Sequence, residues 1–318
     1  MFFRPKLGLT LGGGGARGGA HLGVLRVLTE LGYKPDVVVG TSIGGFIAAM
    51  IGAGWTIDQI ESFFYDTDFA SMISLDRTGR GLVSTRSLEA LLYSHFGDAD
   101  LRELSPKVAL VASDVRHHHR ILIERGPVVK AILASSAIPG LFPPVEWGEY
   151  LLVDGAVTDN LPTQATYQLG AQRVVAVDIG GYKAGIGLTL DEMGTLAKQV
   201  QRALYWLLSL SKRQAAFDTL VESSRLSFSM LVHYQLAMFP PDVLIRPVIP
   251  DNVKVLSMER MREAAKAGKR AARQMAPQIR AIMKRRRWKR AALYSLPPLI
   301  TAQPYPDGNR PALRGNQQ

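Results

Sequence analysis

The pentapeptide Gly-Thr-Ser-Ile-Gly at residues 40–44 constrains this chain of 318 residues more than any other feature. It closes the apolar run 37–39 and opens the apolar run 46–51. A strand that ends in Gly-x-Ser-x-Gly and turns directly into a helix exposes its serine on a sharp bend, and flanking Gly40 and Gly44 let the backbones pass closely. The first N–H groups of the helix would stabilise negative charge there. The pattern predicts Ser42 as a nucleophile, although an ordinary glycine-rich turn also fits it.

A glycine-rich loop at residues 12–19 precedes this turn and follows an expected first strand. Acyl transfer from an ester needs backbone N–H donors fixed where the carbonyl oxygen becomes an oxyanion, and residues without side chains let a substrate lie against the main chain. We therefore expect Gly13, Gly14 and Gly15 to form an oxyanion hole.

The same loop also fits a second function. Gly13, Gly15 and Gly18 spell G-x-G-x-x-G after a strand, which is the dinucleotide-binding fingerprint, with Glu30 or Asp36 as ribose partners. This alternative leaves Ser42 and the acidic turn described next without a role.

A short apolar strand, residues 151–153, ends in Asp154 and Gly155. An ionised aspartate at hydrogen-bond distance can take the proton of a serine hydroxyl without an intervening histidine, so we expect Asp154 to be the base. Four other aspartates also stand near expected strand ends: Asp36, Asp114, Asp159 and Asp178. Position along the chain does not choose among these acids.

Together these segments resemble the patatin-like phospholipases, serine lipid acyl hydrolases with a Ser-Asp dyad. The matching segments are 13–18, 20–25, 40–44, 134–139, 142–144, 154–156 and 159–162. The resemblance covers residues 5 to 180 and implies Ser42 as nucleophile, Asp154 as base and the main chain of the glycine loop as oxyanion hole. Arg17 could orient that loop or face a lipid phosphate. No metal and no cofactor is implied.

The α/β-hydrolase fold is the main alternative among serine hydrolases, and its triad runs Ser, then Asp or Glu, then His. Ser42 lies too near the N-terminus to have several sheet strands before it. His233, the one histidine after Asp154, falls in a helix-like segment. A dyad is therefore the simpler interpretation.

Short apolar runs alternate with helical patterns, which predicts a three-layer α/β/α fold with a mainly parallel central sheet. The expected strands are 6–11, 36–39, 108–112, 121–123, 151–153, 174–178 and 243–245. We expect a catalytic domain at 5–253, with a helical, lid-like insertion at 188–239. A basic helical segment at 254–292, interrupted by Pro277, and a disordered tail at 293–318 would follow.

Charge is concentrated in the segment 254–292. It holds fourteen Lys and Arg against Glu259 and Glu263, a net charge of +12, whereas the whole chain has +11. Such a segment can be a solvated helix face or bind nucleic acid nonspecifically. We expect it to dock on an anionic membrane surface, with Trp288 among the cations as an interfacial anchor. We expect no specific nucleic-acid partner, and the sequence does not indicate an oligomeric state.

The cysteine, histidine and apolar content of the sequence bears on metal binding, disulfides and membrane insertion. The absence of cysteine excludes disulfides and thiolate metal sites. His117, His118 and His119 are expected at an exposed hairpin tip and not at a metal, because adjacent strand residues point to opposite faces. No signal-peptide-like run precedes the glycine loop. Glycines interrupt the long uncharged run 37–57, so we expect no transmembrane helix and a cytoplasmic protein that is at most peripheral on the membrane.

The leading hypothesis is a serine hydrolase that cleaves acyl esters of phospholipids or lysophospholipids through an acyl-enzyme. A lipid-binding regulator that has the fold without the chemistry is the alternative from another class. The preferred head group and acyl position, and the choice between water and another alcohol as acceptor, are not encoded in any pattern we recognise.

Overall fold

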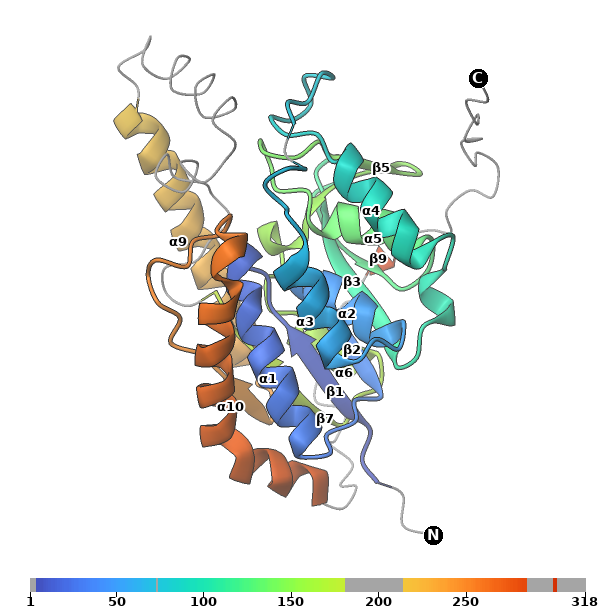
Figure 1. Cartoon of the computed structure of the whole chain (residues 1–318), viewed down its shortest axis with the longest axis vertical. Coiled ribbons are helices and arrows are strands. Elements are labelled where there is room, and N and C mark those ends of the chain that lie inside the picture. Colours follow the sequence, from blue (N-terminus) through green and yellow to red (C-terminus); the bar gives the residue numbers. More distant parts are fainter. Residues whose placement is uncertain (1–3, 73, 181–213, 285–299, 302–318) are drawn as a thin grey trace.

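A nine-stranded sheet with helices on both faces forms the centre of the protein (Figure 1). The computed structural model describes residues 4–72, 74–180, 214–284 and 300–301. The strands are β1 (Leu7–Leu11), β2 (Val37–Thr41), β3 (Lys107–Asp114), β4 (His119–Ile123), β5 (Val145–Trp147), β6 (Tyr150–Asp154), β7 (Arg173–Val177), β8 (Val243–Ile245) and β9 (Ile300–Thr301). Their order is β5-β6-β3-β2-β1-β7-β8, and β4 pairs with β3 and β9.

The middle of the sheet is parallel. β1 lies between β2 and β7, and β3 and β8 extend the parallel set on either side. β4 and β6 pair with β3 in the antiparallel sense, as β5 does with β6. The expected α/β fold with a mainly parallel sheet and helices on both faces is confirmed.

Side chains of the central strands alternate between two hydrophobic layers. Val38 packs with the helices that follow β1 and β2, whereas Val37 and Val39 pack with Ala165 on the opposite face. Because both faces are covered, every residue of β1 and β2 is buried, which explains why the two strands consist of apolar residues, glycine and threonine, without a charge.

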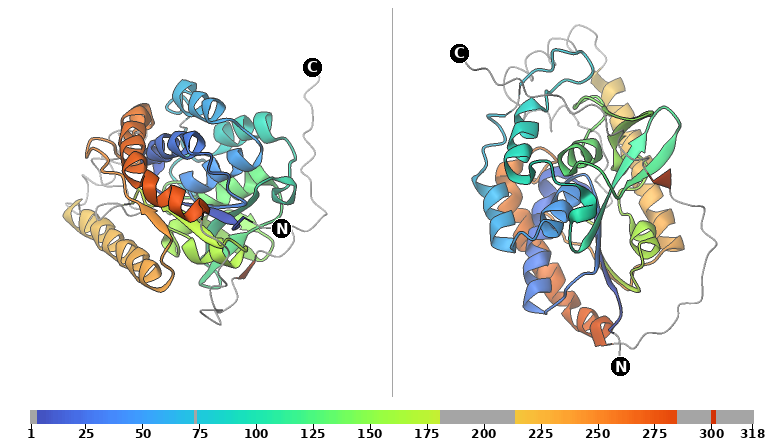
Figure 2. Two further views of the ribbon diagram at one scale, coloured as in Figure 1. Left: turned by 90° about the horizontal axis from the view of Figure 1, so that it is seen from below. Right: turned by 90° about the vertical axis from the view of Figure 1, so that its right-hand side faces the viewer.

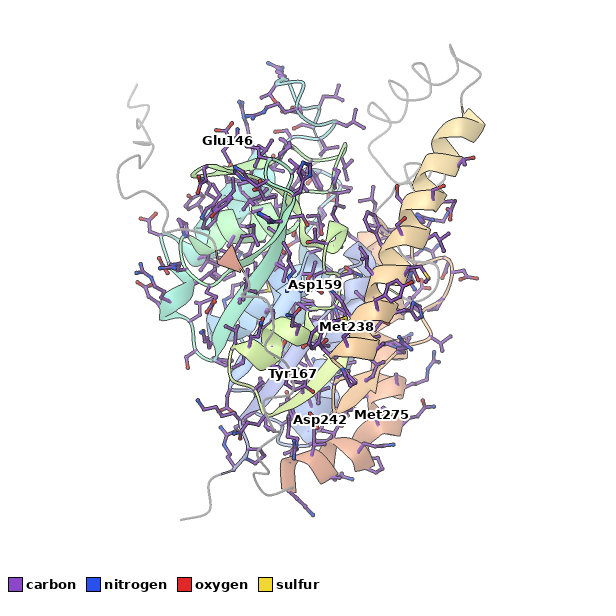
Figure 3. All side chains as sticks on the ribbon, turned by 180° about the vertical axis from the view of Figure 1, so that it is seen from behind. Glu146, Asp159, Tyr167, Met238, Asp242 and Met275 are labelled. Atoms are coloured by element: carbon purple, nitrogen blue, oxygen red, sulfur yellow. The ribbon has the colours of Figure 1, made fainter. Side chains whose placement is uncertain are left out.

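Eight helices are described around the sheet: α1 (Gly19–Glu30), α2 (Ile43–Gly52), α3 (Ile57–Asp66), α4 (Arg86–Phe96), α5 (Val128–Ser135), α6 (Thr163–Gln168), α9 (Gln214–Met238) and α10 (Met261–Lys284). α1 and α10 lie side by side in two perpendicular views (Figures 1 and 2). α6 and α9 are seen on the face turned toward the viewer in Figure 3. Tyr167 of α6 donates to the backbone oxygen of Pro240, just beyond α9, at 2.9 Å.

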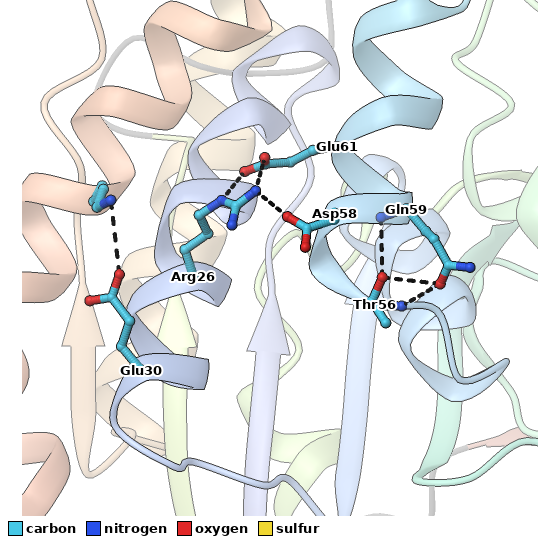
Figure 4. A network of polar contacts seen from close by, with 7 residues as sticks. Arg26, Glu30, Thr56, Asp58, Gln59 and Glu61 are labelled. Carbon is cyan, nitrogen blue, oxygen red and sulfur yellow. Dashed lines mark hydrogen bonds and ion pairs between the residues drawn. The ribbon is translucent and has the colours of Figure 1, made fainter.

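The first helix, α1, is fixed by polar contacts on its outer side (Figure 4). Arg26 of α1 donates to Glu61 of α3 at 2.9 Å and to Asp58 at 2.6 Å. Glu30, at the end of α1, lies 3.9 Å from Lys269 and from Arg273 of α10. These contacts hold α1, which follows the glycine loop, between α3 and α10.

All seven expected strands are present, with small shifts of their ends. β5 was not predicted, because Val145–Trp147 is short and its Glu146 is exposed. α10 begins at Met261 and not at Lys254, and it continues through Pro277. The expected interruption is wrong because Pro277 lies on the exposed side of the helix, where the carbonyl of Arg273 that loses its N–H partner can bind water.

Several expectations concern residues outside the described ranges. These include the first half of the lid-like insertion, residues 188–213, and the cations around Trp288; residues 214–238 form α9. In the expected tail, Ile300 and Thr301 pair with β4. Among the described helices, none is long and apolar enough to cross a lipid bilayer.

Candidate active site

Two strand ends meet on one edge of β3. Thr41, the last residue of β2, lies opposite Val111, and Asp154, the last residue of β6, lies opposite the next residue, Ala112. β4 occupies the other edge of β3. Because β2 runs parallel to β3 and β6 runs antiparallel to it, the two chains approach each other head on. Sheet register therefore brings the residue after Thr41 beside Asp154.

That residue is Ser42, and its hydroxyl donates to Oδ2 of Asp154 at 2.7 Å. Both side chains are buried. Ser42 has φ 55° and ψ −127°, a strained conformation that residues with a side chain rarely adopt. Its N–H donates to Oγ of Ser135 at 2.9 Å, and Ser135 in turn donates to the Val111 oxygen at 2.6 Å. The strained turn is thereby held from β3 and α5.

The glycines around the two strand ends are required by close backbone packing. A Cβ on Gly40 would lie 2.2 Å from the oxygen of Gly44, and one on Gly44 would lie 2.2 Å from the oxygen of Leu11. Gly155 approaches the Val111 oxygen equally closely. The supporting glycines named from the sequence therefore let the serine turn and the Asp154 turn fit against their neighbours.

The Asp154 carboxyl has two hydrogen bonds and no exposed surface. Its Oδ1 accepts the N–H of Ala156 at 2.9 Å while Oδ2 accepts the Ser42 hydroxyl. Burial raises the pKa of Asp154 to about 7, although both hydrogen bonds act in the opposite direction. A carboxylate of this basicity can take a proton near neutral pH more readily than an ordinary aspartate.

The other candidate aspartates are engaged elsewhere. Each is bound by a cationic or histidine side chain: Asp36 by Arg4 at 2.7 Å, Asp114 by His117 at 2.6 Å, Asp159 by Arg120 at 2.6 Å and Asp178 by Arg246 at 2.9 Å. Among the described aspartates, only Asp154 is hydrogen-bonded to Ser42. The geometry thus separates acids that the sequence left equivalent.

The glycine loop lies directly against the serine turn. A Cβ on Gly13 would be 3.1 Å from Cβ of Ser42. The Gly13 N–H, however, donates to the backbone oxygen of Asn160 at 3.2 Å and to its Oδ1 at 3.1 Å. Of the three expected oxyanion donors, Gly13 is therefore occupied. Within the described ranges, the N–H groups of Gly14 and Gly15 have no acceptor.

Residues around the glycine loop fix its course. Gly15 has φ 55°, and the next N–H, of Ala16, donates to the Val255 oxygen at 2.8 Å. Arg17 donates from Nη1 to the Gly180 oxygen at 3.1 Å, so its guanidinium contacts the chain after β7. His21 is buried and donates from Nε2 to the Gly12 oxygen at 2.8 Å, and burial lowers its pKa to about 4. A neutral His21 thus supports the loop.

Three supporting residues were not given a role from the sequence: Ser135, His21 and Asn160. Ser135 and Asn160 contact segments far apart in the chain, whereas His21 contacts Gly12, nine residues before it. All three lie in segments that carry the family resemblance, but no local pattern indicated their contacts. No described histidine is hydrogen-bonded to Ser42 or Asp154; His233 contacts the Ser229 oxygen within α9. Across the described ranges, no group of His, Cys, Asp or Glu could hold a metal ion.

The dinucleotide alternative meets an obstacle in the same region. Its two proposed ribose partners are engaged, Glu30 with cations of α10 and Asp36 with Arg4 and the N–H of Leu7. The glycine loop, in turn, packs against Ser42 and Val255. These contacts agree better with a site built around the serine.

A family model described as patatin-like phospholipase matches residues 9–167, half of the 318 residues. The matched segment contains the glycine loop, Ser42 and Asp154, and the chain belongs to the patatin-like phospholipase family.

Relatives with known names agree with this assignment. An uncharacterized NTE family protein of Mycobacterium tuberculosis is 30% identical over 184 residues, which cover 57% of this chain and 51% of that protein. The lysophospholipase NTE1 of Debaryomyces hansenii is 30% identical over 55% of this chain and 12% of its own length. The match thus spans about half of the first relative and far less of the second. The crystal structure of VipD from Legionella pneumophila shares the fold, with a TM-score of 0.53 at 16% identity over 86% of this chain and 67% of that one.

Proposed function

We propose that this protein is a serine-dependent lipid acyl hydrolase that cleaves acyl esters of phospholipids or lysophospholipids. The observation that carries the proposal is the 2.7 Å hydrogen bond from the Ser42 hydroxyl to a buried Asp154 carboxylate. Membership of the family and the lysophospholipase among the relatives support a lipid ester as the substrate class.

The reaction would proceed in two halves. Asp154 takes the proton of Ser42 as Oγ attacks the ester carbonyl, and the carbonyl oxygen becomes an oxyanion next to the N–H groups of Gly14 and Gly15. The bond to the lipid alcohol then breaks, and the alcohol leaves with the proton that Asp154 holds. In the second half Asp154 takes a proton from water, the hydroxide attacks the acyl-serine, and the fatty acid leaves as Ser42 regains its proton.

The function is tested by the release of fatty acid from phosphatidylcholine vesicles and lysophosphatidylcholine micelles. We expect release by the wild-type protein and a loss of at least about 10³-fold in Ser42→Ala and in Asp154→Asn, because each removes a reacting group. Ser94→Ala, an exposed serine of α4, is the matched control and should retain activity. A folded wild-type protein that binds these lipids without releasing fatty acid would instead be a lipid-binding regulator. Activity retained in Ser42→Ala would exclude Ser42 as the nucleophile.

We further propose that the basic segment docks the enzyme on anionic membranes. In α10, four exposed cations have no ion pair among the described residues: Lys266, Arg270, Arg280 and Lys284. Spacings of 4, 10 and 4 residues place them within one narrow stripe of the helix. Anionic lipid attracts each nearby cation by about 1 kcal/mol.

Truncation is a poor test of docking, because α10 packs on α1 and the residues before it contact the glycine loop. The sharper variant replaces the four cations by Gln together. We expect reduced sedimentation with phosphatidylserine vesicles at low salt, and less difference at high salt because charges are screened. The control replaces four other exposed cations: Lys6, Lys34, Arg77 and Arg86. Equal vesicle binding by the two quadruple variants would exclude α10 as the docking surface.

A further inference from the structure

The side-chain amide of Asn160 binds both backbone groups of Gly13. Its Oδ1 accepts the Gly13 N–H at 3.1 Å, and its Nδ2 donates to the Gly13 oxygen at 3.3 Å. An amide has one acceptor and one donating end, so this reciprocal pairing also fixes which way the Asn160 side chain faces. Hydrophobic side chains of similar size could make neither bond.

This pairing orients the neighbouring peptide group. The Gly13 oxygen and the Gly14 N–H belong to one planar trans peptide, in which they point in opposite directions. Because the oxygen is held at Asn160, the Gly14 N–H is fixed to point away from Asn160. The next peptide is held similarly, since the Gly14 oxygen accepts the N–H of Arg17 at 3.2 Å. The two N–H groups without an acceptor in the described chain, those of Gly14 and Gly15, thus belong to peptides of fixed orientation.

The same stretch of chain also holds the serine turn. The backbone oxygen of Asp159 accepts the hydroxyl of Thr41, next to Ser42, at 2.8 Å. The Asp159 carboxylate is anchored in turn by Arg120 at 2.6 Å. Residues 159 and 160 therefore tie the glycine loop and the nucleophile turn to one support, a short distance along the chain from Asp154.

We propose that Asn160 is a positioning residue that aims the Gly14 peptide at the developing oxyanion. The proposal rests on the hydrolase function above. A hydrogen bond on the carbonyl also polarises the peptide and strengthens its N–H as a donor. Removing an entire oxyanion donor costs about 10²–10³-fold in kcat. Without the Asn160 side-chain amide the Gly14 N–H is still present and only its orientation is lost. We therefore expect a smaller effect, a decrease of about tenfold to a hundredfold in kcat with little change in KM.

Two substitutions of Asn160 distinguish a role in orienting the Gly14 peptide from a role in packing alone. Asn160→Leu removes both hydrogen bonds. Asn160→Asp retains the acceptor for the Gly13 N–H but, when ionised, opposes the Gly13 oxygen with a second negative oxygen. When protonated, the same carboxyl can donate to that oxygen and so restores the pattern of the amide. Asn252, an exposed asparagine that contacts Glu263, supplies the matched controls Asn252→Leu and Asn252→Asp.

The experiment measures kcat and KM for a soluble p-nitrophenyl ester between pH 4 and 8, with circular dichroism to verify folding. Each rate is divided by the wild-type rate at the same pH, which cancels the titration of Asp154. We expect the Asn160→Asp ratio to rise about tenfold toward pH 4, because an ordinary aspartate has a pKa of about 3.9, and the Asn160→Leu ratio to stay low and flat. The ratios of both Asn252 variants should remain near one.

Other outcomes overturn the proposal. A folded Asn160→Leu variant with wild-type kcat, or an Asn160→Asp ratio that does not rise as pH falls, would show that Asn160 does not aim the loop. If Asn160→Leu fails to fold, the pH profile of Asn160→Asp decides alone. A folded wild-type protein without esterase activity would instead refute the hydrolase function itself, and the proposal with it.

Discussion

The Ser42 hydroxyl and the Asp154 carboxylate form their 2.7 Å hydrogen bond at a buried position, where Asp154 has no exposed surface. Burial raises the basicity of the carboxylate, and it also lowers the free energy of unfolding when the carboxyl is ionised. Ionisation of Asp154 therefore increases activity and decreases stability.

The first prediction concerns the pH dependence of hydrolysis. Asp154 must be ionised to act as a base, and its pKa is raised to about 7. We expect kcat/KM for a soluble ester to rise about tenfold per pH unit below pH 7 and to level off above it. An ordinary aspartate would give a plateau extending below pH 5, and that result would contradict the proposed environment of Asp154.

The second prediction concerns the free energy of unfolding. The pKa of Asp154 is raised on folding from 3.8 to about 7, so the native state is penalised as pH rises through this range, fully so above pH 7. Asparagine can accept from Ala156 and donate to Ser42 without charge. We expect Asp154→Asn to be more stable than wild type at pH 8 by on the order of 2–4 kcal/mol, and by much less near pH 4. Urea unfolding at both pH values measures this, and an equal difference at both would contradict it.

The third prediction concerns the packing of α10 on α1. A Cβ on Gly268 would lie 1.9 Å from the backbone oxygen of Ala20. Gly268→Ala should therefore force the helices apart and destabilise the protein by about 1–3 kcal/mol, although alanine favours helix in general. Gln274→Ala, at an exposed position of the same helix, is the control. A variant at 268 as stable as this control would show that α10 is not packed as described.

The parts of the fold that the sequence predicted depend on local signals. The apolar runs of β1 and β2 predict strands because both faces of the sheet are buried. The glycines flanking Ser42 predict a sharp turn because the turn leaves no room for side chains. Asp154 was one of five aspartates near expected strand ends, and the resemblance supported it over the other four. Its place beside Ser42 follows from strand register.

The supporting contacts of the site could not be predicted from local sequence patterns. Asn160 lies 147 residues from Gly13 along the chain, and no pattern around either residue predicts that their side chain and backbone pair. For the same reason, the sequence did not indicate that the Gly13 N–H, an expected oxyanion donor, is bound by Asn160. Pro277 was expected to interrupt the basic helical segment, yet α10 continues through it, with buried residues on both sides at Ala272 and Ile279.

The central claim, that Asp154 activates Ser42 as a nucleophile, is tested most directly by covalent labelling with a fluorophosphonate and mass spectrometry of the labelled peptides. The account predicts one adduct, on Ser42 among all serines of the folded wild-type protein, and labelling at least about a hundredfold slower in Asp154→Asn. Absence of an adduct at Ser42 in folded protein, or labelling of Asp154→Asn at the wild-type rate, would contradict it.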